Sequence, residues 1–233
     1  MIQQPVAGRQ ILILSTGIVG LVVVLFGALL IAGKLLEVTA DSLWVLLTST
    51  LALLSTLLAV LMVSSYRKWK IPANELGLIR PSMKFLHLLW QGPVILAVAV
   101  SLQILTMLLI AKGQAKSNSS NSFDDLLAST PNLGLVVLFA VTMSVLTPVW
   151  EELFFRGFMF SWLNAKLNVF LTILAIGIVF ALVHGMVLLT PYYLVIGAGL
   201  TWLRYFHGNI WAPLAMHITL NSLVVVIALV SYI

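Results

Sequence analysis

The sequence has no cysteine, which excludes disulfides, a thiolate nucleophile and any metal site built on thiolates. Charged residues are also scarce, at 8% of the 233 residues, whereas 61% are apolar. Soluble domains carry roughly 25% charged residues, so a soluble domain of this composition is excluded. No glycine-rich phosphate loop and no G-x-S-x-G motif occurs, which disfavours nucleotide binding and serine catalysis. The composition that remains is that of a polytopic helical membrane protein.

Apolar runs of about 20 residues, the length that crosses a bilayer as a helix, predict an all-α bundle of about seven transmembrane spans. The expected spans are Ile11–Gly33, Leu43–Ser65, Leu86–Ala111, Leu133–Leu163, Val169–Leu189, Tyr192–Tyr205 and Ile210–Ile233. The fourth is too long for one straight crossing, and Pro148 within it removes an amide and frees the carbonyl of Ser144. We therefore expect a kink there, or an eighth span if the helix breaks. The first run lacks a small-residue cleavage site and is expected to be a retained span.

The loop Tyr66–Phe85 predicts the orientation of the chain in the membrane. It carries five basic residues against the single acid Glu75, and by the positive-inside rule it is cytoplasmic. Seven spans then place the N-terminus in the cytoplasm and the C-terminus outside. The net charge of +5 is accordingly interpreted as an orientation signal and not as a nucleic-acid footprint. The hydrophilic segment Lys112–Pro131 falls on the outer side, where its acids are expected to be solvated.

Two adjacent carboxylates and an arginine stand in the apolar segment Pro148–Phe160, which reads PVWEELFFRGFMF. Glu152 and Arg156 are four residues apart, so they share one helix face in the order that favours an ion pair. Glu151 points about 100° away and has no such partner four residues on. An acid at membrane depth costs several kcal/mol unless it is paired or faces a wet cavity, so Glu151 is a candidate functional residue.

Two later spans carry further polar side chains at helical spacing. The fifth contains FALVH, with Phe180 and His184 one turn apart, and the seventh contains HITLN, with His217 and Asn221 one turn apart. A single histidine in a membrane helix is often satisfied by a neighbouring carbonyl. Three spans that each contribute an ionisable or amide group instead predict a shared site inside the bundle, because such groups are costly when they face lipid.

These groups suit hydrolysis. Glu151 with His184 can hold and deprotonate a water as general base, while His217 and Asn221 can donate hydrogen bonds to the oxyanion of a tetrahedral intermediate. Glu152 and Arg156 would orient the site or engage a substrate carboxylate. An alternative assembly makes Glu151, His184 and His217 three zinc ligands with an open fourth position. No HExxH motif is present, so the favoured mechanism needs no cofactor and zinc remains open.

The three motifs resemble those of the CPBP intramembrane protease family, which includes CAAX prenyl endopeptidase type 2 and the bacterial Abi proteins. EELFFR is similar to its EExxxR motif, FALVH to FxxxH and HITLN to HxxxN, in the same order, and the resemblance covers roughly Leu133–Leu223. It implies that Glu151 works with His184 on the water and that His217 and Asn221 form the oxyanion hole. It gives Glu152 and Arg156 supporting roles.

The resemblance also implies how the chain is divided and what it acts on. Residues 1–132 would be N-terminal transmembrane helices and loops, and 133–233 the catalytic helical core. The expected activity is that of an endopeptidase of a prokaryotic cell membrane, acting on a peptide or membrane-protein substrate, lipidated or not, and not on nucleic acid. The alternative is a non-catalytic peptide-binding or bacteriocin-immunity protein on the same scaffold. A third reading, a proton-coupled transporter, is disfavoured because no internal repeat is found.

Overall fold

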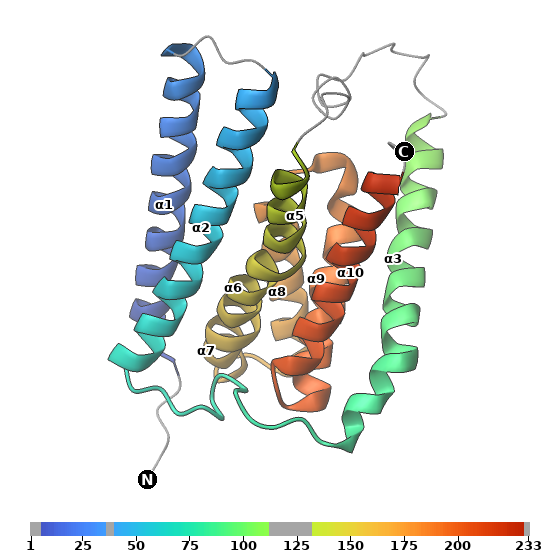
Figure 1. Cartoon of the computed structure of the whole chain (residues 1–233). Coiled ribbons are helices and arrows are strands. Elements are labelled where there is room, and N and C mark those ends of the chain that lie inside the picture. The colour runs from blue at the N-terminus through green and yellow to red at the C-terminus, as the bar shows by residue number, and fades with distance from the viewer. Residues whose placement is uncertain (1–5, 36–39, 112–131, 231–233) are drawn as a thin grey trace. The chain divides into compact units, whose positions relative to one another are not determined.

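A computed structural model describes residues 6–35, 40–111 and 132–230 of the chain, and within these ranges every regular element is helical (Figure 1). The expectation of an all-α protein is therefore confirmed. The α-helices are α1 Gly8–Leu35, α2 Ala40–Lys68, α3 Leu88–Ala111, α5 Leu133–Val141, α6 Thr147–Glu152, α7 Phe160–Asn164, α8 Val169–Val183, α9 Thr190–His207 and α10 Trp211–Val230.

Six helices of the described chain are long and apolar enough to cross a membrane, so the protein is polytopic. The fifth expected span is shorter than predicted, because α8 ends at Val183 rather than near Leu189. Gly185 follows with a φ of +65°, a left-handed conformation that stops the helix. At about 1.5 Å per residue, α8 is roughly 22 Å long, short of the roughly 30 Å hydrocarbon core.

The fourth expected span is one continuous helix of 32 residues, Leu133–Asn164, and does not break into two. It contains α5, α6 and α7, joined by the π-helical segments Thr142–Leu146 and Leu153–Met159. The first π-helical segment lies directly before Pro148, where the missing amide leaves a carbonyl without its usual partner. The second contains Arg156, so the predicted motif lies on irregular helix, as is common at functional sites.

The described residues group into two compact units, each of which is described by itself. One unit contains residues 71–111 and 151–216, and the other contains residues 9–35, 40–70, 132–150 and 217–230. The first unit therefore holds α3, α7, α8 and α9 together with Glu151 and the residues that follow it. The second holds α2, α5 and most of α10.

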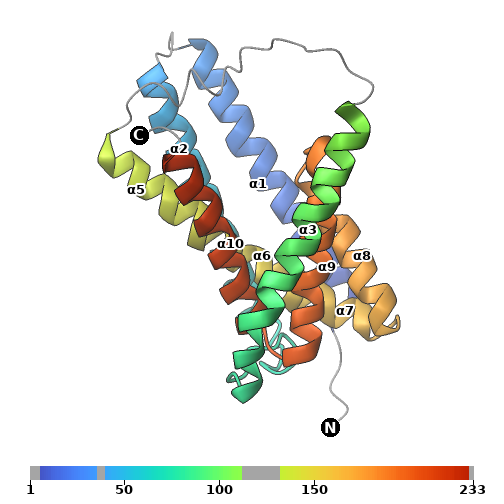
Figure 2. The ribbon, with the colours of Figure 1, turned by 90° about the vertical axis from the view of Figure 1, so that its right-hand side faces the viewer.

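In the first unit, α8 and α9 lie side by side in both views (Figures 1 and 2), and α9 also contacts α3. Glycines permit this close approach. A Cβ placed on Gly197 would lie 2.9 Å from the Cβ of Phe180, and one on Gly177 would lie 3.1 Å from that of Ala198. Because real Cβ atoms do not approach so closely, the glycines set the separation of the two helices that hold much of the candidate site.

In the second unit, α2 packs against α5 and the first π-helical segment. Ser55 and Thr147 are joined by a hydroxyl hydrogen bond of 3.0 Å. Trp44 meets Phe139 edge to face, with ring centroids 5.8 Å apart. Packing and one polar contact thus fix the long helix against α2 on the N-terminal side of Pro148.

The loop that the charge pattern places in the cytoplasm is folded onto the first unit. Leu76 is fully buried, and the amide of Ile210 donates to the carbonyl of Gly77 at 3.0 Å. Ser161 donates its hydroxyl hydrogen to the carbonyl of Glu75. The loop is thus held to the helices at three successive residues. The segment Lys112–Pro131, for which an outer position was predicted, lies outside the described residues.

Candidate active site

Glu152 and Arg156 form the ion pair that their spacing predicts. Arg156 Nη1 donates to Glu152 Oε1 at 2.8 Å, and both side chains are 0% exposed. Water does not screen a pair in such surroundings, and the loss of one partner would leave an uncompensated buried charge. The buried ion pair therefore stabilises the fold of the helical segment that carries Glu152 and Arg156.

Arg156 has further partners that tie the motif helix to α8 and α9. Its Nη2 donates to the carbonyl of Gly197 at 2.9 Å. The guanidinium carbon lies 4.7 Å from the centroid of the Phe180 ring and 5.7 Å from that of Phe155, which are cation–π distances. These contacts enclose the guanidinium and favour an orienting role for Arg156 over an interaction with a substrate carboxylate.

A second buried arginine, Arg204, extends this network toward the loop between α2 and α3. Its Nε donates to the carbonyl of Arg156 at 3.0 Å, and its Nη2 donates to the carbonyl of Glu75 at 3.3 Å. Its guanidinium also lies 4.9 Å from the Phe160 ring centroid. A Cβ on Gly77 would lie 2.6 Å from the guanidinium carbon, so only glycine fits beside it. The sequence gives no local signal for these contacts, because the partners are backbone carbonyls far along the chain.

Glu151, the neighbour of Glu152, lies in different surroundings. It is 8% exposed, whereas Glu152 is fully buried. Its carboxylate is close enough to interact electrostatically with the Arg156 guanidinium and with the phenol of Tyr193 on α9. The two adjacent acids thus share Arg156 as an electrostatic partner, and Glu151 interacts with Tyr193 as well.

His184 lies at the C-terminal end of α8 and is half-buried. Its Nδ1 lies 2.7 Å from the carbonyl oxygen of Phe180, one turn earlier. Because a carbonyl only accepts, Nδ1 carries the proton, and the lone pair of the neutral ring is at Nε2. The imidazole stacks on Tyr193, with centroids 4.2 Å apart and planes 24° from parallel. Tyr193 was missed in the sequence, where TPYYL looks like ordinary aromatic residues at the start of a span.

His217 and Asn221 belong to the second unit. His217 is 3% exposed, and the Asn221 amide nitrogen donates to the carbonyl of Met143 at 2.9 Å. Met143 lies in the first π-helical segment, so Asn221 joins α10 to the long helix. An amide nitrogen has two N–H groups, and this contact uses one of them. The first unit brings together Glu151, Glu152, Arg156 and His184, and the second holds His217 with Asn221.

Four phenylalanines in and after the EELFFR motif are buried, and so is His207 at the end of α9. Phe154, Phe155, Phe158 and Phe160 are at most 6% exposed, so they pack inside the fold. His207 is 7% exposed. Its Nε2 lies 2.8 Å from Oε1 of Gln91, a fully buried residue of α3. Burial of His207 therefore follows from a partner that is 116 positions away in sequence.

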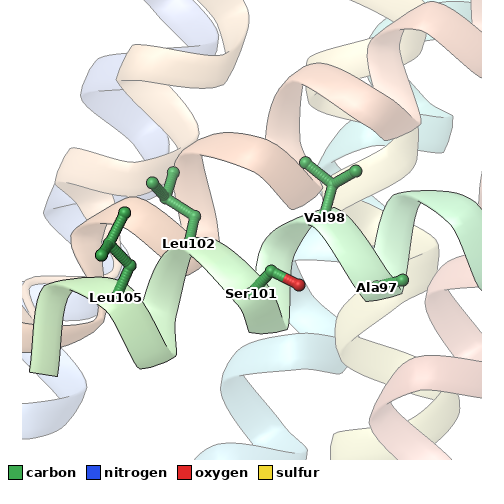
Figure 3. A pocket seen from close by; sticks show the side chains of 5 residues that line it. All are labelled: Ala97, Val98, Ser101, Leu102 and Leu105. Atoms are coloured by element: carbon green, nitrogen blue, oxygen red, sulfur yellow. The ribbon is translucent and has the colours of Figure 1, made fainter. Parts of the chain in front are cut away.

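Within the described ranges, no three His, Asp or Glu side chains are grouped closely enough to hold a metal ion. A separate apolar groove along α3 is lined by Ala97, Val98, Ser101, Leu102 and Leu105 (Figure 3). All five side chains come from a single membrane-length helix and only one is polar, which is the composition of a lipid-facing surface.

Comparison with known proteins addresses the segment that contains these residues. Residues 133–223 match the family model described as type II CAAX prenyl endopeptidase, Rce1-like. The family resemblance is confirmed. The Rce1-like segment contains all three motifs and each of the six candidate site residues.

The family model matches residues 133–223 and no further. The chain is 30% identical over 94 residues to a Bacillus subtilis (strain 168) protein named "Putative membrane peptidase YdiL". That match covers 40% of this chain and 38% of the relative, well under half of its length. No solved structure matches.

Proposed function

We propose that this protein is an intramembrane endopeptidase that hydrolyses a peptide bond of a membrane-associated protein or peptide. The observation that carries the proposal is the Rce1-like segment, in which all three motifs fall on helices of a polytopic membrane protein. The similarity of the chain to the B. subtilis protein named "Putative membrane peptidase YdiL" supports the same class of reaction.

In the proposed reaction, Glu151 and His184 activate the attacking water. The Glu151 carboxylate accepts a proton from the water as the water oxygen attacks the scissile carbonyl carbon. His184 assists through Nε2, the nitrogen that carries the lone pair when Nδ1 donates to Phe180. The proton then passes to the leaving nitrogen as the carbon–nitrogen bond breaks, so that an acid and an amine are released.

His217 and Asn221 are proposed to stabilise the oxyanion of the tetrahedral intermediate. Both carry N–H donors, and preorganised donors at such a position are worth about 100- to 1,000-fold each in rate. The hydrogen bond from Asn221 to Met143 supports this role, because it fixes the orientation of the amide and still leaves its second N–H.

Glu152 and Arg156 are proposed to have a structural role that supports the site. Their burial and their contacts with α8 and α9 give them the properties of a brace for the helix that carries Glu151. No step of the proposed reaction runs through a metal.

The wider assignment is part of the same proposal. Residues 133–233 form the catalytic core, and residues 1–132 supply the remaining membrane helices. The protein lies in a prokaryotic cell membrane, with the N-terminus in the cytoplasm and the C-terminus outside. Its substrate is a peptide or membrane protein, and the assay below decides whether a prenylated terminus is required.

The test is a proteolysis assay on the purified full chain in detergent, with quenched peptides that carry or lack a prenylated terminus. Wild type is compared with Glu151→Gln and His184→Ala, each with and without a strong chelator. The proposal predicts cleavage by wild type, a loss of about 100- to 10,000-fold in either variant, and no effect of the chelator.

Each alternative gives a different result in this assay. A metalloprotease would lose activity with chelator and regain it with zinc. A peptide-binding or immunity protein would bind peptide equally well as wild type and as Glu151→Gln, and would release no product. Either result overturns the proposed mechanism.

A further inference from the structure

Two residues hold the His184 side chain in place, and only one of them belongs to the three motifs. The first is the contact of Nδ1 with the carbonyl of Phe180, at 2.7 Å, together with the Phe180 ring at a centroid distance of 4.4 Å. Phe180 belongs to the FALVH motif. The second is the stacked ring of Tyr193, at 4.2 Å and 24°. Tyr193 belongs to no motif.

The local fold explains why His184 needs the second contact. His184 directly follows the last residue of α8, and Gly185 after it has a positive φ. The helix therefore precedes His184 and does not continue beyond it. The imidazole turns about its Cβ–Cγ bond, and the hydrogen bond at Nδ1 is one restraint on that rotation. The stacked ring adds a second restraint, because rotation would break the contact between the two faces.

Tyr193 reaches His184 because the chain turns back at this point. The short 3₁₀ helix Val187–Leu189 separates α8 from α9, and Pro191 stands in the first turn of α9. Proline at this position fixes the start of the helix, so Tyr193 lies one turn along α9 and faces the end of α8.

Tyr193 is also electrostatically coupled to the other member of the proposed pair. Its phenol and the Glu151 carboxylate interact, although they lie on different helices. Tyr193 is thus a shared neighbour of the two groups that would act on the water. Burial of its ring is partial, which leaves this side of the site less enclosed than the Glu152–Arg156 pair.

We propose that Tyr193 is a positioning residue that fixes the orientation of the His184 imidazole relative to Glu151. This inference rests on the proposed function. The stacked ring does the positioning, and the hydroxyl is dispensable for it. Without the stacked ring the imidazole is less restrained and spends less of its time with Nε2 in the reactive direction, and misplacement of a reacting group by about 1 Å costs on the order of 100-fold in rate.

The test uses three variants of the full chain in detergent. Tyr193→Leu removes the ring, Tyr193→Phe keeps it, and Tyr192→Leu is the matched control at the adjacent residue, which meets the edge of Tyr193 at 5.6 Å. Tyr193→Leu is expected to lower kcat about 100-fold with KM unchanged. Tyr193→Phe and Tyr192→Leu are expected to stay within about threefold of wild type.

A second readout does not depend on activity. The chain has four histidines, so histidine-labelled protein gives few imidazole signals, and His184→Ala assigns the relevant one. Tyr193→Leu should shift the His184 ring signals because the ring current of the stacked phenol is lost. Tyr192→Leu should leave them in place.

The outcomes separate the two proposals. An inactive wild type overturns the proposed endopeptidase function, and with it the catalytic meaning of the stacked pair. An active wild type whose kcat is unchanged in Tyr193→Leu overturns the positioning role alone. Loss of activity in Tyr193→Leu that Tyr193→Phe does not rescue, or that appears as a higher KM, also contradicts it. Loss with unmoved His184 signals contradicts the stacking as its cause.

Discussion

Glu151 and Glu152 are adjacent in sequence, yet the regions around them differ in nearly every respect. Around Glu152, the charges are fully buried, the ion pair is 2.8 Å long, and the guanidinium is bound by α9 and enclosed by aromatic rings. Glu151 is 8% exposed and interacts electrostatically with Arg156 and with Tyr193, a half-buried residue on which the half-buried His184 stacks. One region is closed and the other is partly accessible.

The difference shows how one of two successive helix residues can have a structural role and the other a chemical role. A buried charge that is already paired has little capacity left for a substrate, and its main effect is on the helix that it braces. A carboxylate beside half-buried aromatic and imidazole groups is able to meet a water or a substrate. The following predictions test this division, from the largest expected effect to the smallest.

Glu152→Gln should destabilise the folded protein strongly. The substitution keeps the shape of the side chain but leaves the Arg156 charge buried without its carboxylate, at a cost of about 3–5 kcal/mol. The measurement is the free energy of unfolding in mixed micelles as SDS is added. The double variant Glu152→Leu with Arg156→Met is the control, since it removes both charges and should recover most of the loss. A stable single variant would show that the closed region is not a structural brace.

Asn221→Ala tests whether Asn221 on α10 has a catalytic role, like the one proposed for Glu151, or a structural role, like the one proposed for Glu152. Loss of an oxyanion donor should lower kcat about 100- to 1,000-fold. Loss of the hydrogen bond to Met143 should lower the free energy of unfolding by only about 1 kcal/mol. Ser222→Ala, at the next position, is the matched control and should change neither value. Should kcat stay within threefold while stability falls, Asn221 would be structural, like Glu152.

Arg204→Lys should weaken the closed region where it meets the loop between α2 and α3. A lysine cannot reproduce the two donors that reach the carbonyls of Arg156 and Glu75, and hydrogen bonds from charged groups contribute about 1.5–3 kcal/mol. A drop of that size in the free energy of unfolding is expected, together with faster proteolysis of the loop near Gly77. Arg67→Lys, on the basic end of α2, serves as the control. Unchanged protection of the loop would argue against Arg204 as its anchor.

Gly197→Ala should separate α8 from α9 slightly. The new Cβ would lie 2.9 Å from the Cβ of Phe180, so one helix must shift, at a cost of about 1–3 kcal/mol. Because Phe180 holds His184, kcat should fall along with stability. Gly20→Ala on α1 is the control, since its Cβ would meet nothing within 4 Å. An Ala variant at position 197 with full stability would contradict the tight packing of this pair.

Local patterns in the sequence predict local structure here. The spacing of Glu152 and Arg156 predicts their ion pair, and the spacing of Phe180 and His184 predicts a contact of one turn; both are present. The apolar runs predict the spans to within a few residues, because a bilayer fixes the length of an apolar helix. The early end of α8 was missed because it depends on the conformation of Gly185 and not on hydropathy.

Long-range contacts to the backbone were not predictable from the same patterns. Arg204 is bound by carbonyls, which every residue carries, so no residue type marks its partners. His207 is buried by Gln91 on another helix, and Tyr193 is selected by the turn between α8 and α9. The roles of Glu151, His184, His217 and Asn221 stay predictions, since they concern a reaction and not a contact.

The most direct test of the division between the two glutamates is to measure Glu151→Gln and Glu152→Gln together, as cleavage rate per folded molecule and as melting temperature in detergent. We predict that Glu151→Gln melts like wild type and loses about 100- to 10,000-fold in rate, whereas Glu152→Gln melts earlier and cleaves normally while it is folded. A Glu151→Gln variant that still cleaves at the wild-type rate would contradict the account.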